Sequence, residues 1–105
     1  MPPTQEQLTE LVRRIVAAVN PLRIILFGSA ARGEMRGDSD LDVLVVMPEG
    51  THRRHTAQSL YPRLVGLNIA VDILVATPAD LERYGDMPGF VYHDVLREGK
   101  ELYAA

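Results

Sequence analysis

Three apolar runs of strand length constrain the fold of this chain more than any other feature. They are Arg23 to Phe27 (RIILF), Asp42 to Met47 (DVLVVM) and Ile69 to Val75 (IAVDILV). Runs of this length, rich in valine, isoleucine and leucine and bounded by turn-forming residues, are typical of buried strands. All three are too short to span a membrane as helices. The chain therefore needs a small sheet whose faces are covered by other elements.

Amphipathic segments supply that cover. From Thr4 to Val19 apolar residues recur at steps of three and four, and Thr4 and Gln7 are spaced for a capping box, so we expect a helix there. The segment from Thr51 to Leu64 predicts a second helix, which Pro62 shortens or kinks.

The C-terminal third predicts two more helices. Thr77-Pro78 starts a short helix, with threonine as the cap and proline at the first position. Pro88 to Glu98 forms the last helix, with Gly99 at the C′ position. The resulting order of elements implies one small sheet covered by helices, in a compact domain of the α/β or α+β class.

Length and composition narrow the class of protein. A chain of 105 residues is expected to form a single domain, residues 1–105. It has no cysteine, which excludes disulfides and thiolate chemistry and fits the cytoplasm. The N-terminus has no basic segment followed by an apolar run, so we expect neither a signal peptide nor a membrane span. The net charge is −3 without a long basic block, so direct DNA binding is not expected.

Three aspartates carry the chemistry. Asp40 and Asp42 are two residues apart, so in an extended chain their carboxylates share one face, with Cα atoms about 6.6 Å apart. Asp72 interrupts the third apolar run and can join them from a neighbouring strand. Two unit charges about 4 Å apart repel by about 1 kcal/mol in water and more in a protein. Such a cluster favours a counter-cation, and hard oxygen ligands select Mg²⁺ or Mn²⁺.

A small-residue turn before these acids predicts a phosphate site. Mg²⁺ binds through a few carboxylates and the phosphates of its substrate, so the acids also predict a triphosphate partner. Gly28-Ser29 lies where a strand breaks into a helix start, whose N–H groups, with the Ser29 hydroxyl, can hold phosphate oxygens. Gly28 allows the backbone to approach closely. Arg32 fits a phosphate contact, the orientation of an acid, or an exposed helix start.

Each of these features alone has a plainer interpretation. A Gly-Ser pair after a strand is commonly a turn, and an Asp-x-Asp loop is commonly solvated. Asp72 lies at a sheet edge, pairs with a cation, or coordinates a metal. The segment from His52 to His55 is interpreted as the solvated start of a helix, and His93 as a packed or surface residue, because it has no second ligand at metal spacing. The tyrosines are interpreted as half-buried residues near the core; they are Tyr61, Tyr84, Tyr92 and Tyr103.

The combined spacing resembles a known family. Gly28-Ser29, ten intervening residues that include Arg32-Gly33, then Asp40-x-Asp42 and a third aspartate in a later apolar strand resemble the minimal nucleotidyltransferases of the polymerase-beta superfamily. Val43 follows Asp42 where many members have leucine, a change that leaves the acid positions intact. The resemblance implies a fold of the α/β (α+β) class, with a small mixed sheet flanked by helices.

The resemblance also implies roles for these residues. Asp40 and Asp42 are expected to bridge two Mg²⁺ ions, with Mn²⁺ as an alternative, and Asp72 to hold the ion on the acceptor side. Gly28 and Ser29 are expected to bind the β- and γ-phosphates of the nucleotide. Arg32 and Gly33, which lie between the two motifs, are assigned to the nucleotide-binding residues.

The implied reaction is nucleotidyl transfer. An acceptor hydroxyl attacks the α-phosphorus of ATP and pyrophosphate leaves, in a two-metal mechanism. Larger members of the superfamily add a helical domain that binds the acceptor, so we expect a partner protein to present it to this chain. Stand-alone members resemble the antitoxins of toxin–antitoxin pairs, which implies transfer of AMP to a tyrosine of a HEPN-type ribonuclease toxin.

Two alternatives stay open at this point. The first is an antitoxin that neutralises its toxin by binding alone, without catalysis. The second is nucleotidyl transfer to a small molecule such as an aminoglycoside, since an acidic cleft suits a cationic substrate. A homodimer would then supply the missing wall of the acceptor site.

Overall fold

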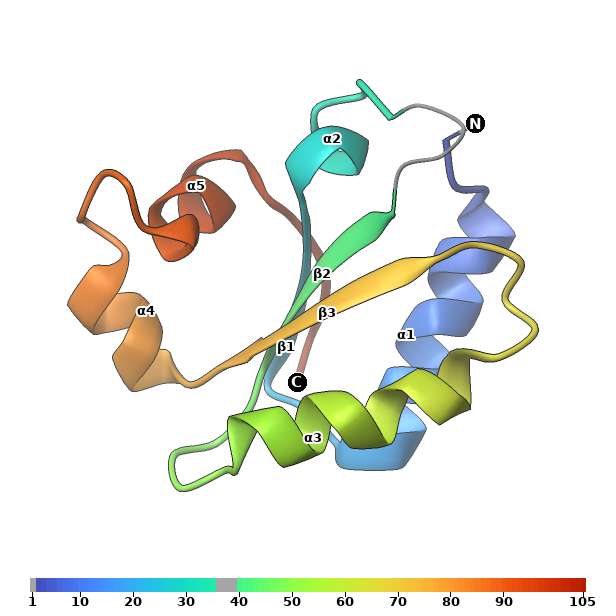
Figure 1. Ribbon diagram of the computed structural model, residues 1–105, viewed down its shortest axis with the longest axis horizontal. Coiled ribbons are helices and arrows are strands. Elements are labelled where there is room, and N and C mark those ends of the chain that lie inside the picture. Colours follow the sequence, from blue (N-terminus) through green and yellow to red (C-terminus); the bar gives the residue numbers. More distant parts are fainter. Residues whose placement is uncertain (1, 36–39) are drawn as a thin grey trace.

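A four-stranded mixed sheet with strand order β3-β2-β1-β4 forms the centre of the fold (Figure 1). The computed structural model describes residues 2–35 and 40–105. The strands are β1 (Arg23–Phe27), β2 (Leu41–Val46), β3 (Val71–Ala76) and β4 (Lys100–Ala104). β1 pairs antiparallel with β2 and with β4, while β2 and β3 run parallel. The expected small mixed sheet flanked by helices is confirmed.

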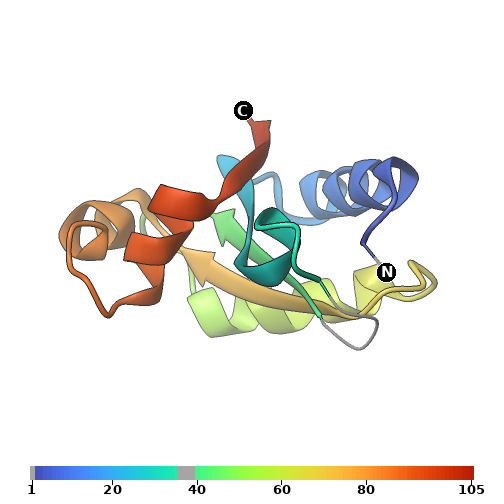
Figure 2. The same cartoon turned by 90° about the horizontal axis from the view of Figure 1, so that it is seen from above.

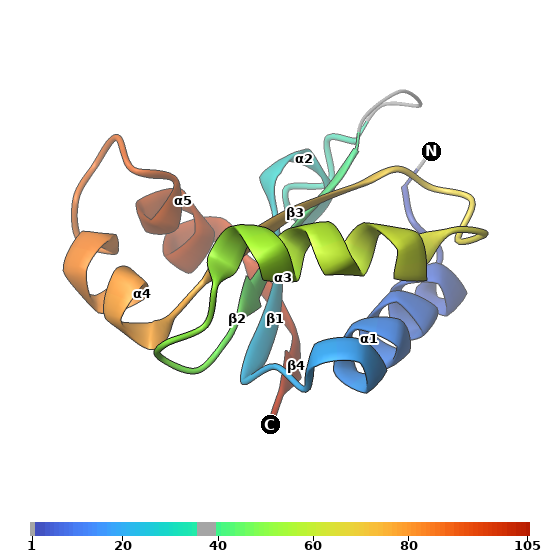
Figure 3. The ribbon, with the colours of Figure 1, turned by 60° about the horizontal axis from the view of Figure 1, so that its bottom comes forward.

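Helices cover both faces of this sheet. One face is covered by α1 (Gln5–Val19) and α3 (Arg53–Leu60), which continues as the 3₁₀ turn η1 (Tyr61–Leu64). Figure 3 shows α3 crossing in front of the strands and α1 to their right. The other face carries α4 (Pro78–Tyr84) and α5 (Val91–Glu98). Figure 2 shows α3 and α5 on opposite sides of β3. A single helical turn, α2 (Gly28–Ala31), follows β1 directly.

The alternation of side chains along the strands divides the core into two clusters. The larger cluster contains Val43 and Ile73 and packs against α1, α3 and η1. The smaller one contains Leu44 and packs against α4 and α5. Successive residues of a strand point to opposite faces of the sheet. Asp42 and Asp72 immediately precede Val43 and Ile73 of the larger cluster, so their side chains lie on the face of the smaller cluster.

Most of the predicted elements are present, with shifted ends. Thr4 caps α1 and forms the expected capping box with Gln7, and Thr77 caps α4 in the same way with Asp80. β1 has the predicted bounds, whereas β2 begins and ends one residue earlier than the predicted run and β3 begins at Val71 instead of Ile69. Pro62 shortens the second long helix as expected, since α3 gives way to the 3₁₀ turn at Tyr61.

The C-terminal end departs from the predictions. α5 begins at Val91 and not at Pro88. Gly99 is its C-cap with an extended backbone (φ −69°, ψ 155°), and not the left-handed C′ residue that was predicted. The chain leaves α5 extended because it enters β4 at once, a strand that the sequence did not predict. No helix in the described part of the chain is long and apolar enough to cross a membrane.

Candidate active site

Asp42 and Asp72 lie side by side near the start of two neighbouring parallel strands. In the register of β2 and β3 they are direct partners, so both side chains leave the sheet on the same face. Asp72 lies on the edge strand and is exposed, which agrees with one of the three interpretations of an aspartate in an apolar run. The structure therefore brings together two carboxylates that are thirty residues apart in sequence.

Asp42 has a carboxyl group with a raised pKa. It is half-buried, and burial raises the pKa of its carboxyl group above the ordinary value, with the negative charges of Asp72 and Asp40 acting in the same direction. The positive charge of Arg32 opposes this shift. A carboxylate that is partly desolvated and faces two other acids is stabilised by a bound cation, which is the environment of a metal ligand.

Gly28 closes the site from the neighbouring strand. Phe27, the last residue of β1, pairs with Asp42, and Gly28 then turns away with a positive φ of 71°. A Cβ atom at Gly28 would collide with the carboxylate of Asp42, so only glycine fits against the acid in this conformation. The immediate neighbour of Gly28 is thus the Asp42 carboxylate, and close approach of its backbone to phosphate oxygens stays a prediction.

The first turn of α2 presents backbone donors beside this acid. Phe27 occupies the N-cap position, and a phenyl ring has no hydrogen-bond acceptor, so the first N–H groups of α2 have no side-chain cap. Ser29 is half-buried in that turn, and its carbonyl accepts a hydrogen bond from the Glu34 N–H at 2.8 Å. Gly33 follows the turn with a φ of 73° and open space around it. These donors are the feature on which the predicted phosphate site depends.

Asp40 lies just outside the strand that carries Asp42. It is exposed and immediately precedes Leu41, the first residue of β2. Its charge still acts on Asp42. Within residues 2–35 and 40–105, no group of three or more histidine, cysteine, aspartate or glutamate side chains is close enough to hold a metal ion. A metal site with all three aspartates thus stays a prediction.

The sequence profile of the family described as "Nucleotidyltransferase domain" matches residues 6–103. The chain belongs to this family. No protein with a curated description matches the sequence. The match covers both strands that carry Asp42 and Asp72 and the Gly28 turn between α1 and β2.

Solved structures of similar fold agree with this assignment. A predicted nucleotidyltransferase from Sulfolobus solfataricus is 20% identical over 94% of this chain and 78% of its own, with a TM-score of 0.64. A chain of a toxin–antitoxin complex with AMP-PNP is 20% identical over 93% and 73% of the two chains (TM-score 0.57). A Shewanella oneidensis complex of a tri-AMPylated HEPN toxin with an MNT antitoxin gives 18% identity over 96% and 72% (TM-score 0.55). At these identities the likeness shows the shared fold.

Arg32 of this nucleotidyltransferase domain lies at the end of α2, where it is held by acids. Its Nη1 atom donates to Glu98 Oε2 of α5 at 3.3 Å, and its Nε atom lies 3.5 Å from Glu34 Oε1. The side chain is 41% exposed. Because its charge lowers the pKa of Asp42, Arg32 is part of the electrostatic environment of the acids as well as a surface residue.

Tyr61 is the site residue that sequence reasoning missed. Tyr84, Tyr92 and Tyr103 are half-buried as expected, but Tyr61 is 43% exposed. Its hydroxyl donates to Asp72 Oδ1 at 3.3 Å and accepts the backbone N–H of Ile73 at 3.0 Å. A tyrosine at the end of a helix gives no signal of such a contact, because the contact depends on how η1 packs beside β3.

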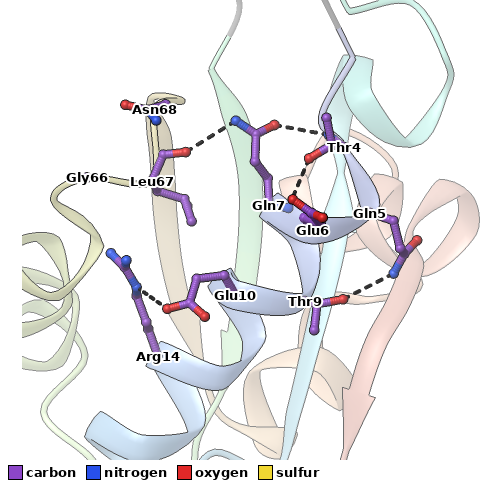
Figure 4. Close-up of a pocket in the computed structure, with 10 residues that line it drawn as sticks. All are labelled: Thr4, Gln5, Glu6, Gln7, Thr9, Glu10, Arg14, Gly66, Leu67 and Asn68. Carbon is purple, nitrogen blue, oxygen red and sulfur yellow. Dashed lines mark hydrogen bonds and ion pairs between the residues drawn. The ribbon is translucent and has the colours of Figure 1, made fainter.

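A cleft of about 670 Å³ lies at the start of α1 (Figure 4). In it the side-chain amide of Gln7 donates to the carbonyl of Leu67 at 3.2 Å, and Glu10 pairs with Arg14. The lining comes from residues 4–14 and 66–68 and, within the described chain, includes neither Asp42 nor Asp72. This cleft lies between α1 and the loop before β3, and it is separate from the site that contains Asp42 and Asp72.

Proposed function

We propose that this nucleotidyltransferase domain transfers AMP from ATP to an acceptor hydroxyl, using Asp40, Asp42 and Asp72. The observation that carries the proposal is the register pair of Asp42 and Asp72, with Gly28 packed against the Asp42 carboxylate. Membership of the nucleotidyltransferase family supports the same chemistry.

The donor set of the site fits a divalent metal ion. Mg²⁺ binds proteins through one or two carboxylates and completes its shell with water and substrate phosphates, so the pair of Asp42 and Asp72 is a sufficient protein contribution for one ion. Asp40 is assigned as the additional ligand that allows a second ion. When bound, Mg²⁺ or Mn²⁺ would neutralise charge on the attacking and leaving oxygens of the displacement.

The remaining residues bind and orient the nucleotide. The N–H groups at the start of α2 and the Ser29 hydroxyl bind β- and γ-phosphate oxygens, and Gly28 keeps this backbone close to Asp42. Arg32 and Gly33 border the same phosphates. Asp72 faces the acceptor, first as a ligand and second as the group that takes the hydroxyl proton. The oxygen–phosphorus bond to the acceptor forms while the bond from the α-phosphorus to pyrophosphate breaks.

The acceptor we propose is a tyrosine hydroxyl of a HEPN-type toxin, so that the protein acts as an antitoxin in the cytoplasm. Two of the similar structures support this choice, since one is a toxin–antitoxin complex with AMP-PNP and the other contains an AMPylated HEPN toxin. Residues 1–105 would form one catalytic domain, and the toxin would present the acceptor.

Labelled ATP tests the proposal directly. The protein is incubated with α-³²P-ATP, Mg²⁺ and the product of the adjacent gene, which the proposal expects to be a small helical protein, and we expect label on a tyrosine of that partner. Asp42→Asn and Asp40→Asn should each abolish transfer, while Asp86→Asn, an exposed aspartate outside the site, should not. Neutralisation of the toxin that persists without label, or label that persists in the Asp40→Asn, Asp42→Asn double variant, would contradict the proposal.

A further inference from the structure

We infer that Tyr61 is a positioning residue for Asp72, and that its phenol holds the Asp72 carboxylate ready for a metal ion. The inference rests on the proposed function, because it concerns the carboxylate assigned to the acceptor side. It adds to the site a residue from η1, an element that carries none of the three acids.

The first observation is the place of Asp72 in the sheet. β3 is an edge strand, so on its outer side alternate backbone groups have no neighbouring strand to bond. Asp72 is exposed on this strand, and an exposed side chain on an edge strand rotates among several conformers unless another group holds it. A metal ligand with a free rotamer loses entropy each time an ion binds.

The second observation is the pair of hydrogen bonds at the Tyr61 hydroxyl. The hydroxyl accepts the outward N–H of Ile73 at 3.0 Å, which satisfies an edge donor. A phenol has a single proton to donate, and this one is directed to Asp72 Oδ1 at 3.3 Å. The backbone of β3 thus fixes the oxygen of the phenol, and the phenol in turn fixes one oxygen of the carboxylate and leaves the other free.

The third observation is the anchoring of Tyr61 itself. Its neighbours Leu60 and Leu64 are 0% and 8% exposed and belong to the larger core cluster. That cluster lies on the face of the sheet opposite to the one from which Asp42 and Asp72 project. The ring of Tyr61 therefore reaches around the free edge of β3 from a rigid base, with Pro62 restricting the backbone at the next position.

Hydrogen bonds to a metal ligand from a surrounding residue commonly change metal affinity or activity by about 10- to 100-fold. The bond here is long and solvent reaches the ring, so we expect an effect near the lower end. The measurement is Mn²⁺ affinity, followed by electron paramagnetic resonance, with AMP-PNP bound and no acceptor present. We expect Tyr61→Phe to weaken Mn²⁺ binding by about 10-fold.

Two further variants make the result specific. Tyr103→Phe is the matched control, because Tyr103 lies on β4, at the opposite edge of the sheet from β3, and it should leave Mn²⁺ affinity unchanged. In an Asp72→Asn background, Tyr61→Phe should cause no additional loss if the phenol acts through that carboxylate. Additive losses would overturn the inference.

A purely structural Tyr61 predicts a different pattern. If the phenol serves only the edge N–H of Ile73, Tyr61→Phe lowers the melting temperature and leaves Mn²⁺ affinity as in the native protein, which would overturn the inference. In a transfer assay the inference also predicts a higher Mn²⁺ concentration for half-maximal rate and a nearly unchanged rate at saturating metal. Because Mn²⁺ binding needs no transfer, failure of the proposed reaction and failure of this inference are distinguished.

Discussion

Gly28 presses its backbone against the carboxylate of Asp42, the residue that pairs with the last position of β1. The contact joins the two motifs of the site, the turn after β1 and the acids of β2 and β3. It requires a residue with a positive φ and without a Cβ atom, which explains glycine here on both counts.

Gly28→Ala should therefore damage the site more than the fold. We expect a loss of about 1–2 kcal/mol in the free energy of unfolding from the left-handed backbone. Displacement of the Asp42 carboxylate by about 1 Å should slow transfer by about 100-fold. Gly50→Ala is the control, because Gly50 also has a positive φ (90°) but has open space around it. Equal rates for the two variants, measured by pyrophosphate release, would refute the role of the contact.

Asp42→Asn is expected to stabilise the protein while it abolishes transfer. Burial raises the pKa of Asp42 in the folded protein, with Asp72 and Asp40 adding to the shift, so the ionised form opposes folding at neutral pH. Protonated Asp42 stabilises the folded state. This contribution to the free energy of unfolding is complete at a pH below the ordinary pKa of 3.8 and is lost as the pH rises through the pKa of Asp42 in the folded protein. Removal of repulsion on the order of 1 kcal/mol should raise the melting temperature by several degrees at pH 7.

Melting curves at pH 7 and near pH 4 check this sign. The gain from Asp42→Asn should shrink at the lower pH, and Asp86→Asn, which replaces an exposed aspartate, should show no such trend. Added Mg²⁺ should raise the melting temperature of the native protein more than that of Asp42→Asn, since a ligand stabilises the state that binds it. A variant less stable than the native protein at pH 7 would count against the electrostatic account.

Arg32 and Arg97 provide a matched pair for the role of positive charge. Both guanidinium groups bond Glu98, at 3.3 Å and 3.0 Å, but only Arg32 is identified as lowering the pKa of Asp42. Arg32→Gln should therefore raise the pKa of Asp42 further and weaken ATP binding several-fold, while Arg97→Gln should do neither. Nucleotide titration with AMP-PNP measures the difference, and equal affinities for the two variants would make Arg32 a surface residue only.

The sequence allowed the acids and their approach from neighbouring strands to be predicted, but not the residue-by-residue pairing of Asp42 with Asp72. The alternation of side chains and the apolar runs were enough to predict β1 and to single out Asp42 and Asp72. Their pairing depends on the register of β2 and β3, which is set by the packing of the whole sheet. β4 was missed because its residues, KELYA, are mostly exposed and resemble a solvated tail until β1 pairs with them. The contact of Tyr61 with Asp72 likewise depends on tertiary packing.

The pair of Arg53 and Asp80 tests whether stability and catalysis can be separated in this fold. Asp80 accepts two hydrogen bonds from the Arg53 guanidinium, at 2.7 Å and 2.9 Å, and a third from the backbone N–H of Thr77 at 3.0 Å. These contacts tie α3 to α4 beyond the far ends of β2 and β3, away from the acids (Figure 1). The hydrogen bond with Arg53 is the largest cause that lowers the pKa of Asp80.

Asp80→Ala should therefore destabilise the protein by roughly 1–2 kcal/mol through the lost cap and ion pair, without changing the transfer rate at a temperature where the protein is folded. Folding lowers the pKa of Asp80. This stabilisation is therefore present at a pH above the ordinary pKa of 3.8 and is lost as the pH falls through the pKa of Asp80 in the folded protein. Melting curves should thus show the largest difference from the native protein at neutral pH. Glu82→Ala, an exposed position on the same helix, is the control. A slower transfer rate in folded Asp80→Ala would mean that α4 communicates with the acids through β3.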